Sequence, residues 1–259
     1  EFGVDITQTP IRQAVKQAQN ANADVIVVRL NNRWAEGLAG MGRLPEDVQN
    51  FDELFRAESI IPIFTDEIPR EWTKQPRVVF WVDDALGGAA FLPFIAKEIY
   101  TTSDARWGGI GGLDFLFGDT GDAVVRDKQY SLRLGHAEGW AIRGGYDARI
   151  IRAMTVVRYV LSYRITGGQA ELLERMPENP GEVLLTWDGN EQEGRADSVA
   201  ERVRGEGKDV LTLNARLARD LGVSRGIADT EDDLLFQMGL ARVAERVGTG
   251  DRVIKSWSD

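Results

Sequence analysis

The stretch VVFWVDDALGGAAFLPFIAKEIYTTSDARWGGIG, residues 78–111, decides the fold of this chain. It begins with the β-branched and aromatic run Val78–Val82, which predicts a strand buried on both faces. Asp83-Asp84 is expected to end that strand, and Gly87-Gly88 predicts a tight turn immediately after it.

The residues after this turn complete a strand–helix–strand unit. The small and apolar run Ala89–Ala96 predicts a helix with no polar face, which must therefore be almost fully buried. Ile99–Thr102 predicts a second short strand, and Trp107–Gly111 a glycine-rich loop. A glycine turn at a helix N-terminus directs backbone N–H groups toward one point, where an oxyanion is stabilised.

The N-terminal part of the chain indicates a parallel sheet. Thr9-Pro10 predicts a helix start, with threonine as the N-cap and proline at the first helical position. Val25–Leu30 is a β-branched run typical of a buried strand. Helices that alternate with buried strands favour an α/β fold whose sheet is mostly parallel. We expect Val25–Leu30, Val78–Val82 and Ile99–Thr102 to be neighbouring strands.

Composition excludes several classes of function. The formal net charge of −10 argues against nucleic acid as a partner. The chain has no cysteine, so disulfides and thiolate chemistry are excluded, and a single histidine, His136, excludes a multi-histidine metal site. No apolar run is long enough to span a membrane. The sequence begins at Glu1, so membrane attachment would need a segment outside it.

Two parts of the sequence resemble one superfamily. Ala85–Ala89 followed by Ala105–Gly108 is similar to the oxyanion-hole segment of the ClpP/crotonase superfamily. Residues 209–235 resemble the C-terminal pattern of its peptidase branch, in which a short strand, a helix and a turn like Gly226–Asp229 close the domain. That branch includes signal peptide peptidase A and the NfeD-type serine peptidases. The resemblance implies one domain over residues 1–259, built as a spiral of ββα units.

The second half of the chain predicts two helices and a less regular segment. A helix is expected over Val124–Arg143, ended by Gly144-Gly145. Asp147 is expected to cap a second helix whose apolar stripe continues to Leu161. Residues 166–209 are expected to form an irregular, charged insertion that contains one strand, Val183–Trp187.

The resemblance implies a catalytic serine and a lysine general base, but the serine is missing here. The lysine corresponds to Lys128, and the nucleophile falls on Gly87 or Ala90, neither of which carries a hydroxyl. Gly87, Gly88 and Gly111 correspond to the oxyanion hole and cleft. A glycine pair that completes the hole in the peptidases is replaced by Arg33-Trp34.

Other candidate groups are weaker. The two glutamates of crotonase-type hydratases would fall on Phe91 and Gly111, which cannot transfer protons. Ser131 lies one helical turn from Lys128, and Ser103-Asp104 precedes the glycine-rich loop. We expect these serines, and His136, to be surface, strand-end or interface residues rather than catalytic groups.

Three functions remain open. The first is a non-catalytic, homo-oligomeric binding or scaffold protein, a pseudo-peptidase that takes an extended peptide or protein ligand and needs no cofactor or metal. The second is a hydrolase with Lys128 as base and an unrecognised nucleophile, and the third a crotonase-like acyl-CoA binder. Seven tryptophans and the Phe115–Phe117 loop favour an oligomer, in which such residues become buried. The resemblance favours an extracytoplasmic location, periplasmic or membrane-associated.

Overall fold

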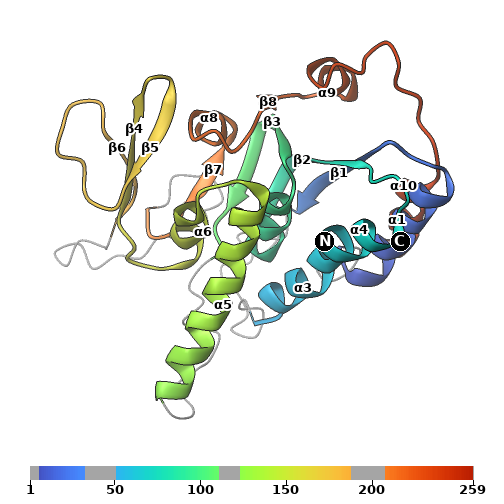
Figure 1. Cartoon of the computed structure of the whole chain (residues 1–259). Coiled ribbons are helices and arrows are strands. Elements are labelled where there is room, and N and C mark those ends of the chain that lie inside the picture. The colour runs from blue at the N-terminus through green and yellow to red at the C-terminus, as the bar shows by residue number, and fades with distance from the viewer. Residues whose placement is uncertain (1–5, 33–50, 111–122, 188–207, 259) are drawn as a thin grey trace.

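The computed structural model describes residues 6–32, 51–110, 123–187 and 208–258 (Figure 1). Its central element is a five-stranded sheet in which the order β1-β2-β3-β7 is extended by β8, which also pairs with β3. The strands are β1 (Val25–Asn32), β2 (Arg77–Leu86), β3 (Glu98–Gly108), β7 (Thr212–Asn214) and β8 (Gly226–Ile227). β1, β2, β3 and β8 run parallel, and only β7 is antiparallel. The predicted α/β class, the mostly parallel sheet and the three neighbouring strands are confirmed.

Strand β2 is apolar from Val78 to Val82 because this part contributes to two cores. Phe80 and Val82 point into the larger core, on the side of the sheet covered by most of the helices. Val79 and Trp81 alternate with them and point to a smaller core that the C-terminal segment covers. In a strand with one exposed face, polar and apolar residues alternate. Val78–Val82 is buried on both faces and therefore contains only apolar residues.

The larger core is covered by helices from the first two thirds of the chain. These are α1 (Gln8–Asn20), α3 (Phe51–Pro62), the π-helical turn η2 (Ile63–Glu67), α4 (Ile68–Glu71), η3 (Gly87–Ile95), α5 (Ala123–Gly144) and α6 (Ala148–Thr155). The predicted start of the first helix was wrong by two residues, since Thr7 is the N-cap. Pro10 still lies in the first turn, where it breaks no intrahelical hydrogen bond.

The predicted buried helix after the glycine turn is confirmed, but it is a 3₁₀-helix. Every residue from Gly87 to Phe94 is buried, and η3 packs between α3 and α5. The prediction that Asp83-Asp84 ends the preceding strand was wrong, because β2 continues to Leu86. Strand β3 likewise continues past its predicted end at Thr102 to Gly108, the second residue of the expected loop.

Helices α5 and α6 confirm the two predicted helices, with one correction. The Asp147 side chain caps α6 by accepting a hydrogen bond from the Arg149 amide. The helix ends at Thr155, however, and Leu161 belongs to the next strand. The apolar stripe therefore combines one face of a helix with the start of a strand, and both parts contribute to the larger core.

Part of the segment expected to be irregular is a second sheet. The three strands, in the order β5-β4-β6, are β4 (Leu161–Thr166), β5 (Gln169–Leu173) and β6 (Val183–Thr186), all antiparallel. β4 and β5 form a hairpin through Gly167-Gly168, both with positive φ, as a two-residue turn of type I′ requires. In Figure 1 this sheet lies at one end of the molecule, beyond α6 and β7.

The connection between β5 and β6 is organised by Glu182. Its carboxylate accepts two hydrogen bonds from Arg175, at 2.7 Å each, and further ones from the backbone amides of Glu178 and Asn179. These donors, with Arg175 the most important, hold the pKa of Glu182 well below its usual range. The folded state therefore binds this proton less tightly than the unfolded chain does.

We expect the β5–β6 connection to loosen in acid. The stabilisation from Glu182 is present at neutral pH and is lost as the pH falls below the carboxyl's ordinary pKa of 4.5 toward its folded value. Glu182→Gln should reproduce the loss at pH 7 as faster hydrogen exchange at the amides of Glu178 and Asn179. Glu178→Gln is the matched control, because its side chain is mostly exposed. Unchanged exchange in Glu182→Gln would contradict this assignment.

Residues 226–240 cover the second face of the central sheet, with Ala228, Leu234 and Met238 in the smaller core. The C-terminal part of the chain contains α8 (Ala215–Asp220), α9 (Glu231–Gln237) and α10 (Gly250–Ser258). Ala218 of α8 belongs to the larger core, and α10 packs against α1. The indole N–H of Trp81 donates to the carbonyl of Ala228 at 2.8 Å, and the Ala228 amide donates to Thr101. Among the described residues, no helix combines the length and apolarity needed to cross a membrane.

Candidate functional site

The glycine turn joins β2 to η3 and is held from both sides. Gly87 has a φ of 65°, a conformation that glycine adopts without strain. The carbonyl of Leu86, directly before it, accepts a hydrogen bond of 2.9 Å from Nδ2 of Asn32, which is completely buried at the end of β1. Asn32 thereby fixes the end of β1 against the turn.

Ala90, one of the two positions that correspond to the nucleophile, lies inside the larger core. Its side chain is inaccessible to solvent, and its carbonyl accepts a 2.8 Å hydrogen bond from the indole N–H of Trp107. The next residue, Phe91, packs edge-on against Trp140 of α5, with ring centroids 5.4 Å apart. This turn is thus part of a rigid, apolar environment.

Lys128, the candidate base, lies on a different part of α5 from the one that reaches the turn. Contact with η3 runs through the second half of the helix, where Ala137 and Ala141 are fully buried. Lys128 is exposed, on the half that extends away from the sheet in Figure 1. It precedes Ala137 by about 13 Å along the helix axis, at 1.5 Å per residue.

The remaining candidates are spread over several surfaces. Ser131 is exposed on the same half of α5 as Lys128. His136 is half exposed, with Nδ1 3.1 Å from a carboxylate oxygen of Glu58 on α3. Gly88 is buried in the turn. Gly111, Arg33-Trp34 and the Phe115–Phe117 loop lie outside the described residues.

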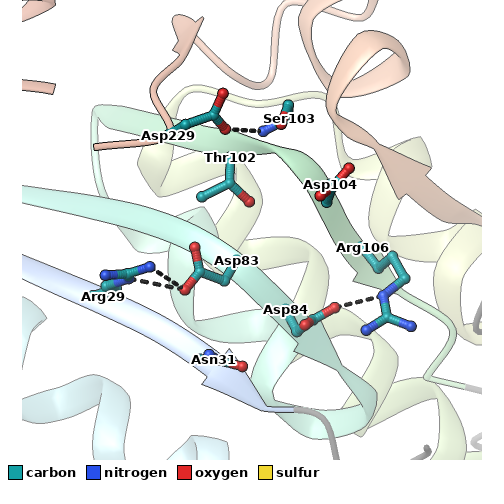
Figure 2. Close-up of a pocket in the computed structure, with 9 residues that line it drawn as sticks. All are labelled: Arg29, Asn31, Asp83, Asp84, Thr102, Ser103, Asp104, Arg106 and Asp229. Carbon is teal, nitrogen blue, oxygen red and sulfur yellow. Dashed lines mark hydrogen bonds and ion pairs between the residues drawn. The ribbon is translucent and has the colours of Figure 1, made fainter. Parts of the chain in front are cut away.

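A pocket opens on the other face of β2, where the registers of three strands shift together. β1 shifts against β2 between Leu30 and Asn31, and β2 shifts against β3 after Val82. Val82 pairs with Thr101, but Asp84 pairs with Arg106, so β3 bulges outward over the residues between. The pocket has a volume of about 520 Å³. Its lining, drawn in Figure 2, is Arg29, Asn31, Asp83, Asp84, Thr102, Ser103, Asp104, Arg106 and Asp229.

Arginines from the neighbouring strands pair with the two aspartates of β2. Arg29 on β1 bonds Oδ2 of Asp83 through Nε at 2.8 Å, and its guanidinium lies 4.4 Å from the ring centroid of Trp81. Arg106 on β3 donates to Oδ1 of Asp84 at 2.6 Å. These pairs explain why two aspartates do not end the strand, since each buried charge has a partner.

The C-terminal segment closes one side of the pocket. The backbone amide of Ser103 donates to a carboxylate oxygen of Asp229 at 2.7 Å (Figure 2). The two candidates Ser103 and Asp104 are therefore next to Asp83, and not next to Lys128. This pocket was not predicted from the sequence because its residues come from four separate segments of the chain. The feature that could have indicated it is the arginine in each neighbouring strand, Arg29 and Arg106, that can pair with Asp83-Asp84.

Comparisons with known proteins give a limited result. No protein-family model matches the sequence, and no curated protein matches it. Two solved structures of the 1510-N membrane-bound stomatin-specific protease are similar to it. A mutant with a serine replaced by alanine is 12% identical, with a TM-score of 0.43, over 90% of this chain and 79% of that one. A lysine-to-alanine mutant in complex with a substrate peptide is 10% identical, with a TM-score of 0.47, over 95% and 83%.

Proposed function

We propose that this chain is a non-catalytic binding or scaffold protein of the ClpP/crotonase type, derived from the peptidase branch. The observation that carries the proposal is chemical: the positions corresponding to the nucleophile are Gly87 and Ala90. Neither has an oxygen or sulfur that can attack a carbonyl. The motifs around the glycine turn and in residues 209–235 support the assignment to that branch.

The placement of Lys128 supports the same conclusion. Acyl transfer through a covalent intermediate needs a nucleophile within hydrogen-bond reach of its base. Lys128 is exposed on the projecting half of α5, whereas Ala90 is fully buried under its other half. A base without a nearby nucleophile can at most activate water.

The test is labelling with a fluorophosphonate probe together with a casein-cleavage assay. We expect no labelling and no cleavage, because losing the nucleophile from such a catalytic unit costs on the order of a million-fold in rate. Lys128→Ala and Ser131→Ala are the informative variants, since Ser131 follows Lys128 by one helical turn. Stoichiometric labelling that both variants abolish would establish the alternative, a hydrolase that uses Ser131.

A thermal-shift comparison distinguishes the proposed peptide-binding protein from the remaining alternative, a crotonase-like acyl-CoA binder. A binding protein with a peptide cleft should be stabilised by extended peptides, because a ligand that binds only the folded state raises the unfolding temperature. An acyl-CoA binder should respond to CoA esters instead. Stabilisation by CoA esters alone would replace the present proposal with the crotonase-like one.

We further propose that the protein is a homo-oligomer. The projecting half of α5 exposes three large apolar side chains, Val124, Val125 and Leu132, each more than half accessible to solvent. A second copy would bury such side chains in a symmetric contact. Light scattering at micromolar concentration should show a species larger than the 28.8 kDa chain, and Leu132→Glu should shift it toward the monomer. A monomer at all concentrations would contradict the proposal.

A further inference from the structure

We propose that the pocket on the outer face of β2 binds a primary ammonium group, such as a lysine side chain of a peptide ligand. The inference is separate from the proposed function, because this face of β2 lies opposite the glycine turn: Trp81 faces the smaller core, and Ala90 the larger one.

The charge of the lining favours a cation. Four aspartates and two arginines surround the pocket, so two negative charges are in excess. The arginines are already engaged, Arg29 with Asp83 and Arg106 with Asp84. Asp104 and Asp229, both exposed, contribute the excess charge at the rim. An anion would therefore meet arginines whose charge is already balanced by carboxylates.

Asp83 supplies the second and decisive observation. Its side chain is only 7% exposed, and both contacts from Arg29 go to Oδ2. The other oxygen, Oδ1, is buried and receives no hydrogen bond from the residues that the structure describes. Figure 2 shows that oxygen directed away from Arg29, toward Thr102 across the pocket. A buried carboxylate oxygen without a donor is unfavourable, so a ligand that brings an N–H donor gains that interaction at little desolvation cost to the protein.

The geometry selects an ammonium rather than a guanidinium or a metal ion. A guanidinium is recognised best by two carboxylate oxygens side by side, but Arg29 already occupies one oxygen of Asp83. An ammonium has three donors on one atom, which suits Oδ1 of Asp83 together with the hydroxyl of Thr102, the side chain nearest that oxygen in Figure 2. In the described parts of the chain, no cluster of three or more acidic, histidine or cysteine side chains is placed to hold a metal ion.

The test is an amide-shift titration of the isotope-labelled full chain with blocked amino acids. The probe is N-acetyl-lysine methylamide; the comparison compounds are the norleucine and arginine analogues. We expect the lysine probe to give saturable shifts at the amides of Thr102 and Ser103 and at the indole of Trp81. Equal binding of the norleucine analogue, or tighter binding of the arginine analogue, would overturn the proposal.

Amino-acid substitutions test whether the lysine probe binds in this pocket. Asp83→Asn should weaken binding of the lysine probe about tenfold, because it removes the charge from the central hydrogen bond. Asp251→Asn on α10 changes the net charge equally, far from the pocket in sequence and fold, and should leave binding unchanged. Asp83→Asn also loosens Arg29, so Thr102→Val provides a second measurement, with an expected loss of about fivefold. Wild-type affinity in both folded variants would show that the pocket is not the binding site.

Discussion

Replacing Gly144 with alanine should destabilise the protein by about 3 kcal/mol, near the upper end for overpacking a rigid site. A Cβ at this position would lie 1.8 Å from the carbonyl oxygen of Phe94 and 2.9 Å from the ring of Tyr146. The obstacle is backbone, so a rotamer change cannot remove it. Phe94 cannot move aside either, since its ring is fully buried between Trp107 and Tyr146.

The same helix provides the control for this prediction. Gly139 also lies in α5, but a Cβ there would meet no atom within 4 Å. Gly139→Ala should therefore stabilise the protein, by up to about 1 kcal/mol, because alanine is the better helix former. Urea unfolding of both variants measures the difference. Similar midpoints for the two would contradict the close approach of α5 to η3.

Trp107→Ala should be the most damaging side-chain truncation, with a loss of about 3–5 kcal/mol in the free energy of unfolding. Trp107 is the largest fully buried side chain among the residues that the structure describes. Its ring lies 4.7 Å from that of Phe94, and its N–H satisfies the buried carbonyl of Ala90. Truncation removes this packing and leaves the carbonyl without a donor.

Two further variants separate the contributions. Trp107→Phe keeps most of the packing but loses the N–H, so it should cost about 1–3 kcal/mol for the unsatisfied carbonyl. Trp257→Ala on α10 removes an indole that is 45% exposed and should have a much smaller effect. Chemical denaturation monitored by circular dichroism gives the free energy of unfolding of each variant and so ranks their effects. A loss from Trp257→Ala as large as from Trp107→Ala would show that the ring does not anchor η3.

The sequence was sufficient to predict where the central strands lie. Val78–Val82 is a continuous apolar run, and its side chains pack into the cores on both faces of the sheet. Val25–Leu30 also forms a strand, but the prediction that it is buried was wrong, because Val27 and Arg29 are exposed on one face. The prediction failed at Asp83-Asp84, because the charges that neutralise these aspartates come from strands on either side. The pairing of Arg29 with Asp83 and of Arg106 with Asp84 follows only from the register of β1, β2 and β3, which the sequence does not give.

The second sheet was predicted only in part: Val183–Trp187 corresponds to β6, but β4 and β5 were missed, for a different reason. Gly167-Gly168 between two short runs is a recognisable hairpin signal, but Leu161 was assigned to the stripe of the preceding helix and residues 166–209 to an irregular, charged insertion. Those charges are part of the sheet's stability: Arg164 and Glu171 pair across the hairpin at 2.7 Å, and Arg175 anchors Glu182. The sequence contains the charged residues of the pocket but does not show that they meet, since that depends on the coincident register shifts of β1, β2 and β3.

The hydrogen bond from Trp81 to Ala228 has a consequence for synthesis on the ribosome. The two residues are 147 positions apart, a distance that takes roughly 7–30 s to translate at about 5–20 residues per second. During that interval Val79, Trp81 and Tyr100 belong to a nascent chain whose covering segment does not yet exist. The outer face of the sheet is thus completed late in synthesis, and its apolar side chains lack their cover until residues 226–238 emerge.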